Sequence, residues 1–160
     1  MSQKTSSSKS KELKIITRHV ITIDDIKNDL RRIKLLYIIY TIGGISEKAL
    51  QHLIYYMKDL EYDLGYDFIV LGTTPSSKML HNDIVALLYV GLIETNPRRK
   101  LVTTSLGKEF LEKVKDSISD EEKETIKKLI DDLRIKIAPI DMEVELSYRS
   151  ARRRRRRRFF

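Results

Sequence analysis

The segment that most constrains this chain is Asp83–Leu111, where an apolar helical pattern runs directly into a short basic hairpin. The helical spacing lasts to Val90, and Gly91 supplies the left-handed residue that commonly ends helices. Two short apolar stretches then flank an Asn96-Pro97 turn signal, beside which lie three cations: Arg98, Arg99 and Lys100. A hairpin this short buries little by itself. We therefore expect it to project a cationic tip, held against the preceding helix.

The residues after the hairpin extend this pattern into a family signature. Thr104 or Ser105 can cap a helix that carries Leu106 and Phe110. The stretch GLIETNPRRKLVTTSLGKEFL resembles the helix end, wing and LT-x-x-G-x-x-x-L motif of winged helix-turn-helix domains, in the style of PadR- and MarR-like regulators. The resemblance implies a mainly α fold with a small β-hairpin (α+β), an added C-terminal helix and DNA binding. The same fold also serves as a protein-docking module, so the motif specifies fold better than function.

Composition, helix-capping signals and a proline divide the chain into four parts. Residues 1–22 are rich in Ser and Lys and are predicted to form a flexible basic arm. We assign 23–116 to the winged-helix domain and 117–138 to a C-terminal helix, which Ser119 opens with a capping box and Pro139 ends. Residues 139–160 are interpreted as a tail, with an alternating stretch from Met142 to Tyr148 that is typical of an edge strand.

Within the domain, hydrophobic spacing predicts three helices before the wing. The first spans Ile26–Ile42 with Asp24 or Asp25 as its cap, the second spans Glu47–Leu60 after Ser46, and the third spans Ser77–Val90. The stretch between the second and third helices is longer than the usual turn of about three or four residues. We interpret it as an insertion in which Phe68–Leu71 forms a buried strand or an extended crossing, and Ile45 is expected to pair with the wing strands.

The positive charge is concentrated at the two ends of the chain. The net charge is +8, yet residues 24–116 are neutral and residues 117–151 carry −3. Residues 1–23 carry +4, and the run Arg152–Arg158 carries +7. The arms are therefore expected to set much of any affinity for a polyanion.

The helix that ends at Val90 is the predicted reader helix, because it leads directly into the wing. Its apolar spacing leaves a set of polar residues near its outer, N-terminal face: Ser76, Ser77, Lys78, His81 and Asn82. Such residues at a helix N-terminus suit phosphate binding and the reading of base edges in a major groove. The alternative is an ordinary solvated helix face.

The two groups of cations are also candidates for contact with nucleic acid. Arg98, Arg99 and Lys100 repel one another unless a polyanion screens them, which favours DNA contact over a solubilising hairpin tip. The second group binds any polyanion: Arg152, Arg153, Arg154, Arg155, Arg156, Arg157 and Arg158. Its alternatives are a targeting-like tail and a translated terminus without a selected role.

The C-terminal helix carries an apolar stripe that the resemblance assigns to dimerisation, as in PadR-like proteins: Ile126, Leu129, Ile130, Leu133 and Ile137. A homodimer would present two reader helices about 34 Å apart, matching a pseudo-palindromic site. The alternative is that this stripe packs against Leu13–Ile26 of its own chain.

The composition argues against several other classes of protein. There is no cysteine, which excludes disulfides and thiolate metal sites, and no apolar run approaches the roughly 18 residues that span a bilayer. The N-terminus lacks a hydrophobic signal core. The three histidines are isolated and no nucleophile–base set is visible, so we expect no enzyme, no metal site and no cofactor. We expect a cytoplasmic, nucleoid-associated protein without membrane contact.

We therefore predict a DNA-binding protein, a transcription regulator or chromatin-associated factor, with double-stranded DNA and a second copy as partners. The first alternative is a protein-interaction module, which the neutral core and the acidic stretch Asp59–Asp67 would suit. The second is RNA binding through the basic arms alone.

Overall fold

The computed structural model describes residues 20–159, so the predicted N-terminal arm lies almost entirely outside the described residues. The chain is mainly helical with two small antiparallel hairpins, which confirms the predicted α+β class. In chain order the elements are α1 (Ile23–Lys27), α2 (Leu30–Ile42), α3 (Glu47–Asp59), β1 (Ile69–Leu71), β2 (Thr74–Ser76), α4 (Lys78–Tyr89), β3 (Ile93–Thr95), β4 (Leu101–Thr103), α5 (Ser105–Lys113), the 3₁₀ turn η1 (Lys115–Ser117) and α6 (Asp120–Arg158).

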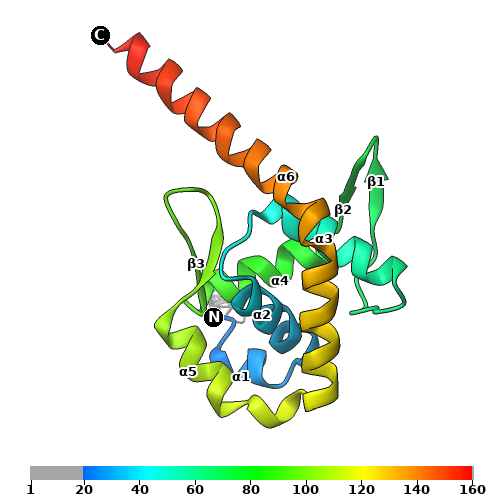
Figure 1. Cartoon of the computed structure of the whole chain (residues 1–160). Helices are drawn as coiled ribbons and strands as arrows, with labels where there is room; N and C mark the ends of the chain where they lie inside the picture. The colour runs from blue at the N-terminus through cyan, green and yellow to red at the C-terminus, as the bar shows by residue number, and fades with distance from the viewer. Residues whose placement is uncertain (1–19, 160) are drawn as a thin grey trace, which may run out of the picture.

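Helix α2 lies at the centre, surrounded by the other helices (Figure 1). It buries residues on nearly every side, including Leu35, Leu36 and Ile38, as expected for a helix that is apolar all round. The helix predicted for Ile26–Ile42 is present from Leu30 to Ile42, but its predicted start is wrong, because Ile26 and Lys27 belong to the separate helix α1. Asp29 accepts a hydrogen bond from the Arg31 backbone N–H at 3.1 Å and starts α2 as its cap. Thr22, rather than Asp24 or Asp25, caps α1.

The predicted wing is present as β3 and β4, which pair in antiparallel register with Ile93 opposite Thr103. Ile45 forms the predicted additional bridge, to Leu101. Gly91 has φ +78 and ends the preceding helix, while the Thr104 hydroxyl donates to the Gly91 carbonyl at 2.6 Å. The same hydroxyl accepts from the Gly107 N–H at 3.1 Å. One threonine therefore caps α5 and ties it to the entrance of the wing.

The insertion between α3 and α4 forms a hairpin that projects from the body (Figure 1). Strands β1 and β2 pair with Ile69 opposite Ser76. The strand predicted within Phe68–Leu71 is present as β1, but its predicted burial is wrong, because Ile69 is 70% exposed and Leu71 is 69% exposed. The inner strand β2 packs against α3, and Pro75 is buried there. The outer strand β1 is left with three apolar side chains in solvent.

Helix α6 contradicts the prediction that Pro139 ends a helix and that a tail follows. The helix runs for 39 residues, through Pro139 and the arginine run, and the predicted edge strand around Met142–Tyr148 is helical. A proline inside a helix removes one backbone hydrogen bond and bends the axis. Here Pro139 is exposed, and Ile135, whose carbonyl loses its partner, is 85% exposed, so water can satisfy that group. Figure 1 shows the axis of α6 changing direction in this region.

This order of helices and the wing is compatible with a winged-helix fold. Helices α2, α3 and α4 bury one shared apolar core with the wing residues Ile93 and Leu101. The insertion and the long α6 are additions to that arrangement.

Gly107 offers a direct test of how closely α5 approaches the wing. A Cβ atom at this position would lie 2.1 Å from the carbonyl oxygen of Leu92 and 2.6 Å from a Thr103 side-chain carbon. Gly107→Ala is expected to lower the free energy of unfolding by about 2–3 kcal/mol, because the backbone must shift. Urea denaturation measures this change. Ser105→Ala, exposed in the same helix, is the control and should change stability by less than about 0.5 kcal/mol.

Candidate nucleic-acid interface

The predicted reader helix, α4, is capped by Ser77, whose side-chain oxygen accepts from the Leu80 backbone N–H. Gln51 of α3 brackets the Ser77 backbone: its Oε1 accepts from the Ser77 N–H at 2.9 Å and its Nε2 donates to the Ser77 carbonyl at 3.2 Å. The predicted role of Ser77 in DNA contact is wrong, because the residue is 1% exposed. Its backbone N–H and carbonyl are both hydrogen-bonded to Gln51. Ser77 is a structural cap that sets where the helix starts.

The other predicted reader residues do lie at the surface. Ser76, Lys78, His81 and Asn82 are exposed, and the face continues with Val85 and Tyr89. The His81 ring contacts the carboxylate of Glu47 at the start of α3. Within residues 20–159, the side chains of Lys78 and Asn82 have neither ion pair nor hydrogen bond, so both are available to a ligand.

The position of α4 depends on a buried carboxylate, Asp83, which is 2% exposed. Its two oxygens accept from Arg31 Nε at 2.8 Å and from Arg32 Nε at 3.0 Å. The Tyr66 hydroxyl donates to it at 2.7 Å, and the Arg31 guanidinium lies 5.1 Å from the centre of the Tyr66 ring. One side chain therefore joins the start of α2, the insertion and α4.

The surroundings of Tyr66 and Arg31 raise the pKa of both side chains. Burial, together with the neighbouring Asp83 charge and hydrogen bond, raises the pKa of Tyr66 well above its usual range, so the hydroxyl remains a donor. The hydrogen bond to Asp83 raises the pKa of Arg31 despite partial burial. Sequence reasoning missed this cluster. The available signal was an acidic residue at an apolar position of α4, between Leu80 and Ile84.

A second polar contact anchors the other end of the insertion. The Tyr62 hydroxyl donates to Glu122 Oε1 at 2.9 Å, and Lys34 pairs with the same carboxylate. Burial would raise the pKa of Glu122, but these two hydrogen bonds lower it below its usual range. The insertion is thus attached to α4 through Tyr66 and to α6 through Tyr62.

Asn96 organises the wing tip, which we define as residues 96–100. Its side-chain oxygen accepts from the backbone N–H groups of Arg98, at 3.0 Å, and Lys100, at 2.9 Å. Arg99 takes the left-handed conformation, with φ +65. Pro97, Arg98 and Arg99 are exposed. Within the described chain, the Arg98 side chain has neither ion pair nor hydrogen bond.

The other two cations of the wing tip contact the second half of α6. The Arg99 guanidinium carbon lies 4.3 Å from the centre of the Tyr148 ring, a cation–π contact. Lys100 Nζ lies 4.0 Å from Asp141 Oδ2, and Asp141 Oδ1 accepts from the Ser46 backbone N–H at 2.8 Å. Asp141 therefore bridges the wing and the N-terminus of α3.

A further ion pair strengthens this attachment, since Lys48 Nζ lies 3.6 Å from Glu143 Oε1. Asp141 and Glu143 of α6 thus contact the N-terminus of α3, Lys100 and Lys48. These are groups that could otherwise bind phosphate. Neither Asp141 nor Tyr148 was singled out from the sequence, because their role depends on α6 continuing beyond Pro139.

The arginine run forms the exposed end of α6. Residues Arg152–Arg158 are helical and exposed, and their side chains extend around the whole helix circumference. They are therefore not a flexible tail, and this basic group has a defined direction.

The predicted dimerisation stripe of α6 is used within the chain. Ile126, Ile130, Leu133 and Ile137 are all at most 7% exposed, and Leu129 is partly buried. They belong to the core, where α6 packs mainly against α3 and also against α2. The stripe therefore packs on its own chain, against α3 and α2. Residues 13–19 of the alternative partner segment, Leu13–Ile26, lie outside the described residues, so packing against that segment stays a prediction.

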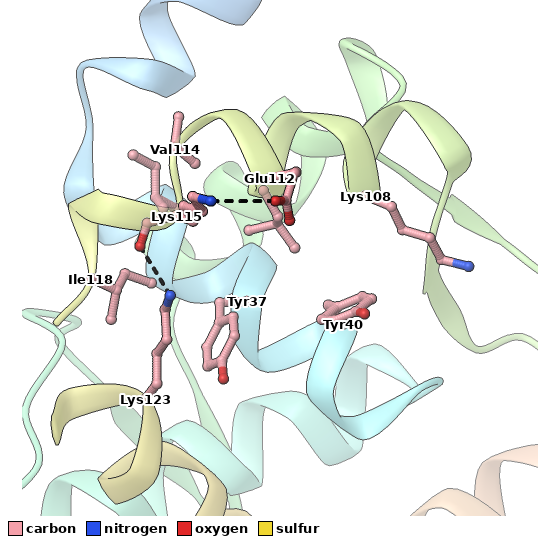
Figure 2. A pocket seen from close by; sticks show the side chains of 10 residues that line it. Tyr37, Tyr40, Lys108, Glu112, Val114, Lys115, Ile118 and Lys123 are labelled. Carbon is pink, nitrogen blue, oxygen red and sulfur yellow. Dashed lines mark hydrogen bonds and ion pairs between the residues drawn. The ribbon is translucent and has the colours of Figure 1, made fainter. Parts of the chain in front are cut away.

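A pocket of about 140 Å³ lies between α2, α5 and the start of α6 (Figure 2). Tyr37 and Tyr40 form part of its lining. Lys115 pairs with Glu112 at 3.6 Å, Lys123 donates to the Lys115 carbonyl at 2.9 Å, and Lys108 extends away from the pocket. No free charged group is directed inward, so we assign no ligand to it.

Comparison with protein-family models, curated proteins and solved structures finds no match to this chain. No relative therefore assigns a role to any residue of the candidate site. Within residues 20–159, no helix combines the length and apolarity needed to cross a bilayer. In the same range, no three His, Asp or Glu side chains gather into a metal-binding group.

Tyr66→Phe tests whether the buried cluster holds the insertion and α4 together. Loss of one hydrogen bond to a charged carboxylate is expected to lower the free energy of unfolding by about 1.5–3 kcal/mol. Chemical denaturation measures the change. Tyr89→Phe is the control, because Tyr89 is 63% exposed and should give no measurable difference. Equal stability of the two variants would show that Asp83 does not need this donor.

Proposed function

We propose that the protein binds double-stranded DNA as a transcription regulator or chromatin-associated factor. The observation that carries the proposal is the exposed wing tip. Its backbone is held by hydrogen bonds to the Asn96 side chain, and the Arg98 side chain has no partner in the described chain. A rigid backbone that presents an unpaired arginine reduces the entropy lost on binding phosphate. The directly preceding helix, α4, adds Lys78, His81 and Asn82.

The proposed complex places the outer face of α4 in a major groove and the wing tip on the flanking backbone. Both elements are near the N-terminus of α3: Glu47 contacts His81, and Ser46 shares Asp141 with Lys100. Arg152–Arg158 would add attraction that is independent of sequence. We propose that a homodimer is the binding form, so that two reader helices meet a pseudo-palindromic site.

Salt titration of duplex binding tests the two groups of arginines. Arg98→Glu is expected to weaken binding at least about tenfold and to flatten the log–log salt dependence by about one unit, because one phosphate contact is lost. Removal of Arg152–Arg158 flattens it by up to about six units if every arginine meets a phosphate. Fluorescence anisotropy of a labelled duplex measures both effects.

Lys113→Glu is the matched control for charge. Lys113 is exposed at the end of α5, outside the proposed interface, and its reversal changes the net charge by the same amount. Equal losses for Arg98→Glu and Lys113→Glu would mean that net charge alone governs binding. Undiminished duplex binding by Arg98→Glu would contradict the proposed wing contact.

Asp141→Asn is expected to tighten duplex binding at least about twofold. The change removes a negative charge beside Lys100 and the N-terminus of α3, where it would repel phosphate, but an amide oxygen can still accept from Ser46. The same anisotropy assay measures it. Asp116→Asn, an equal charge change at an exposed residue of η1, should leave affinity unaltered. Weaker binding by Asp141→Asn would instead make Asp141 a support of the wing.

A second candidate function is a protein-docking module, and the β1–β2 hairpin favours it. Ile69, Val70 and Leu71 are exposed on an outer strand, which is a common site for addition of a further strand. The end of α3 and the loop that follows it hold four exposed acidic residues that would repel DNA: Asp59, Glu61, Asp63 and Asp67. Under this alternative, Arg98→Glu leaves duplex binding unchanged, whereas substitutions in β1 abolish partner binding.

A further inference from the structure

A second apolar stripe lies on the side of α6 that faces away from the body. Ile135, Met142 and Leu146 are 85%, 63% and 55% exposed, and Pro139 completes a spacing of four, three and four residues. This spacing keeps the four side chains on one face of the helix. The buried residues Leu133 and Ile137 lie on the opposite side.

We infer that this stripe pairs α6 with α6 of a second copy, in antiparallel orientation. The inference deepens the proposed homodimer by naming its surface, and it does not require DNA binding. With the two-fold axis between Pro139 and Met142, Ile135 lies opposite Leu146 of the second copy, and Pro139 lies opposite Met142. Each contact occurs twice, as a symmetric interface requires.

Charges that continue the same face beyond the stripe select the antiparallel orientation. Before the stripe, the face carries Glu124, Lys128 and Asp131, with Asp132 beside them; after it come Arg149, Arg153 and Arg157. A parallel pair would place these arginines against their own copies. The antiparallel pair places them against three carboxylates and one lysine, which is favourable.

This geometry also gives the arginine run two separate sides. Arg153 and Arg157 face the second copy, whereas most of the remaining arginines point away from the seam because helical residues are spread around the axis. The run can thus stabilise the pair and still present cations to a polyanion.

The single unfavourable pair supplies a gain-of-function test. Lys128 lies opposite Arg153 of the second copy, so Lys128→Glu is expected to tighten the dimer several-fold. Ile135→Asp places a charge in the seam and should raise the dimer dissociation constant at least about tenfold. Sedimentation equilibrium of the full chain measures both. Val85→Asp, at an exposed apolar residue of α4, is the control and should leave the dimer intact.

The cysteine-free sequence allows the orientation to be mapped directly. A mixture of Ile135→Cys and Leu146→Cys proteins should form a disulfide between the two variants under oxidation, because opposed seam positions lie within bonding range. Neither variant alone should do so, since eleven residues separate position 135 from position 146, which is about 16 Å along the axis.

Self-linked Ile135→Cys would overturn the antiparallel arrangement and establish a parallel one. A protein that stays monomeric at every soluble concentration would overturn the pairing altogether. If that monomer binds anionic lipid vesicles and Ile135→Asp abolishes binding, the stripe contacts a membrane surface. If the unmodified protein forms the antiparallel dimer but does not bind duplex DNA, the proposed function is contradicted and the inferred pairing is not.

Discussion

The arrangement of this molecule depends on one buried carboxylate. Asp83 accepts hydrogen bonds from two arginines at the start of α2 and from the hydroxyl of Tyr66 in the insertion. A buried charge is costly unless its partners satisfy it, and here three residues donate four hydrogen bonds to its two oxygens. Because Asp83 is part of α4, the network orients the proposed reader helix relative to the core. It also explains how a long insertion can interrupt the helical core without loosening it.

Local signals in the sequence predicted the wing and most helix starts. Ser46, Thr104 and Ser119 each cap the helix expected from them, because a cap depends on only a few neighbouring residues. The left-handed residue at Gly91 is local in the same sense. These elements could therefore be predicted without knowledge of the tertiary structure.

The predictions that the structure contradicts concern residues whose burial or exposure is set by tertiary packing. Phe68–Leu71 is apolar and was predicted to be buried, yet β1 faces solvent because β2 lies between it and α3. Pro139 was predicted to end a helix, but it lies on an exposed face where water can replace the missing partner. In the candidate site, Ser77 was mistaken for a ligand contact for the same reason, since its burial against Gln51 is a tertiary property. The pairing of wing cations with α6 followed from the unforeseen continuation of that helix.

The close approach at Gly107 fixes the base of the wing independently of its tip. Because α5 lies against the Leu92 carbonyl and Thr104 holds the entrance of the hairpin, the two strands are fixed at their base. The tip, by contrast, depends mainly on the Asn96 side chain and contributes no side chain to the core. Pro97 and Arg98 could therefore diversify through evolution with little effect on folding, whereas Arg99 is constrained by its left-handed backbone and its contact with Tyr148. A chain of this architecture could acquire a new binding preference by changing the tip while retaining the rest of the molecule.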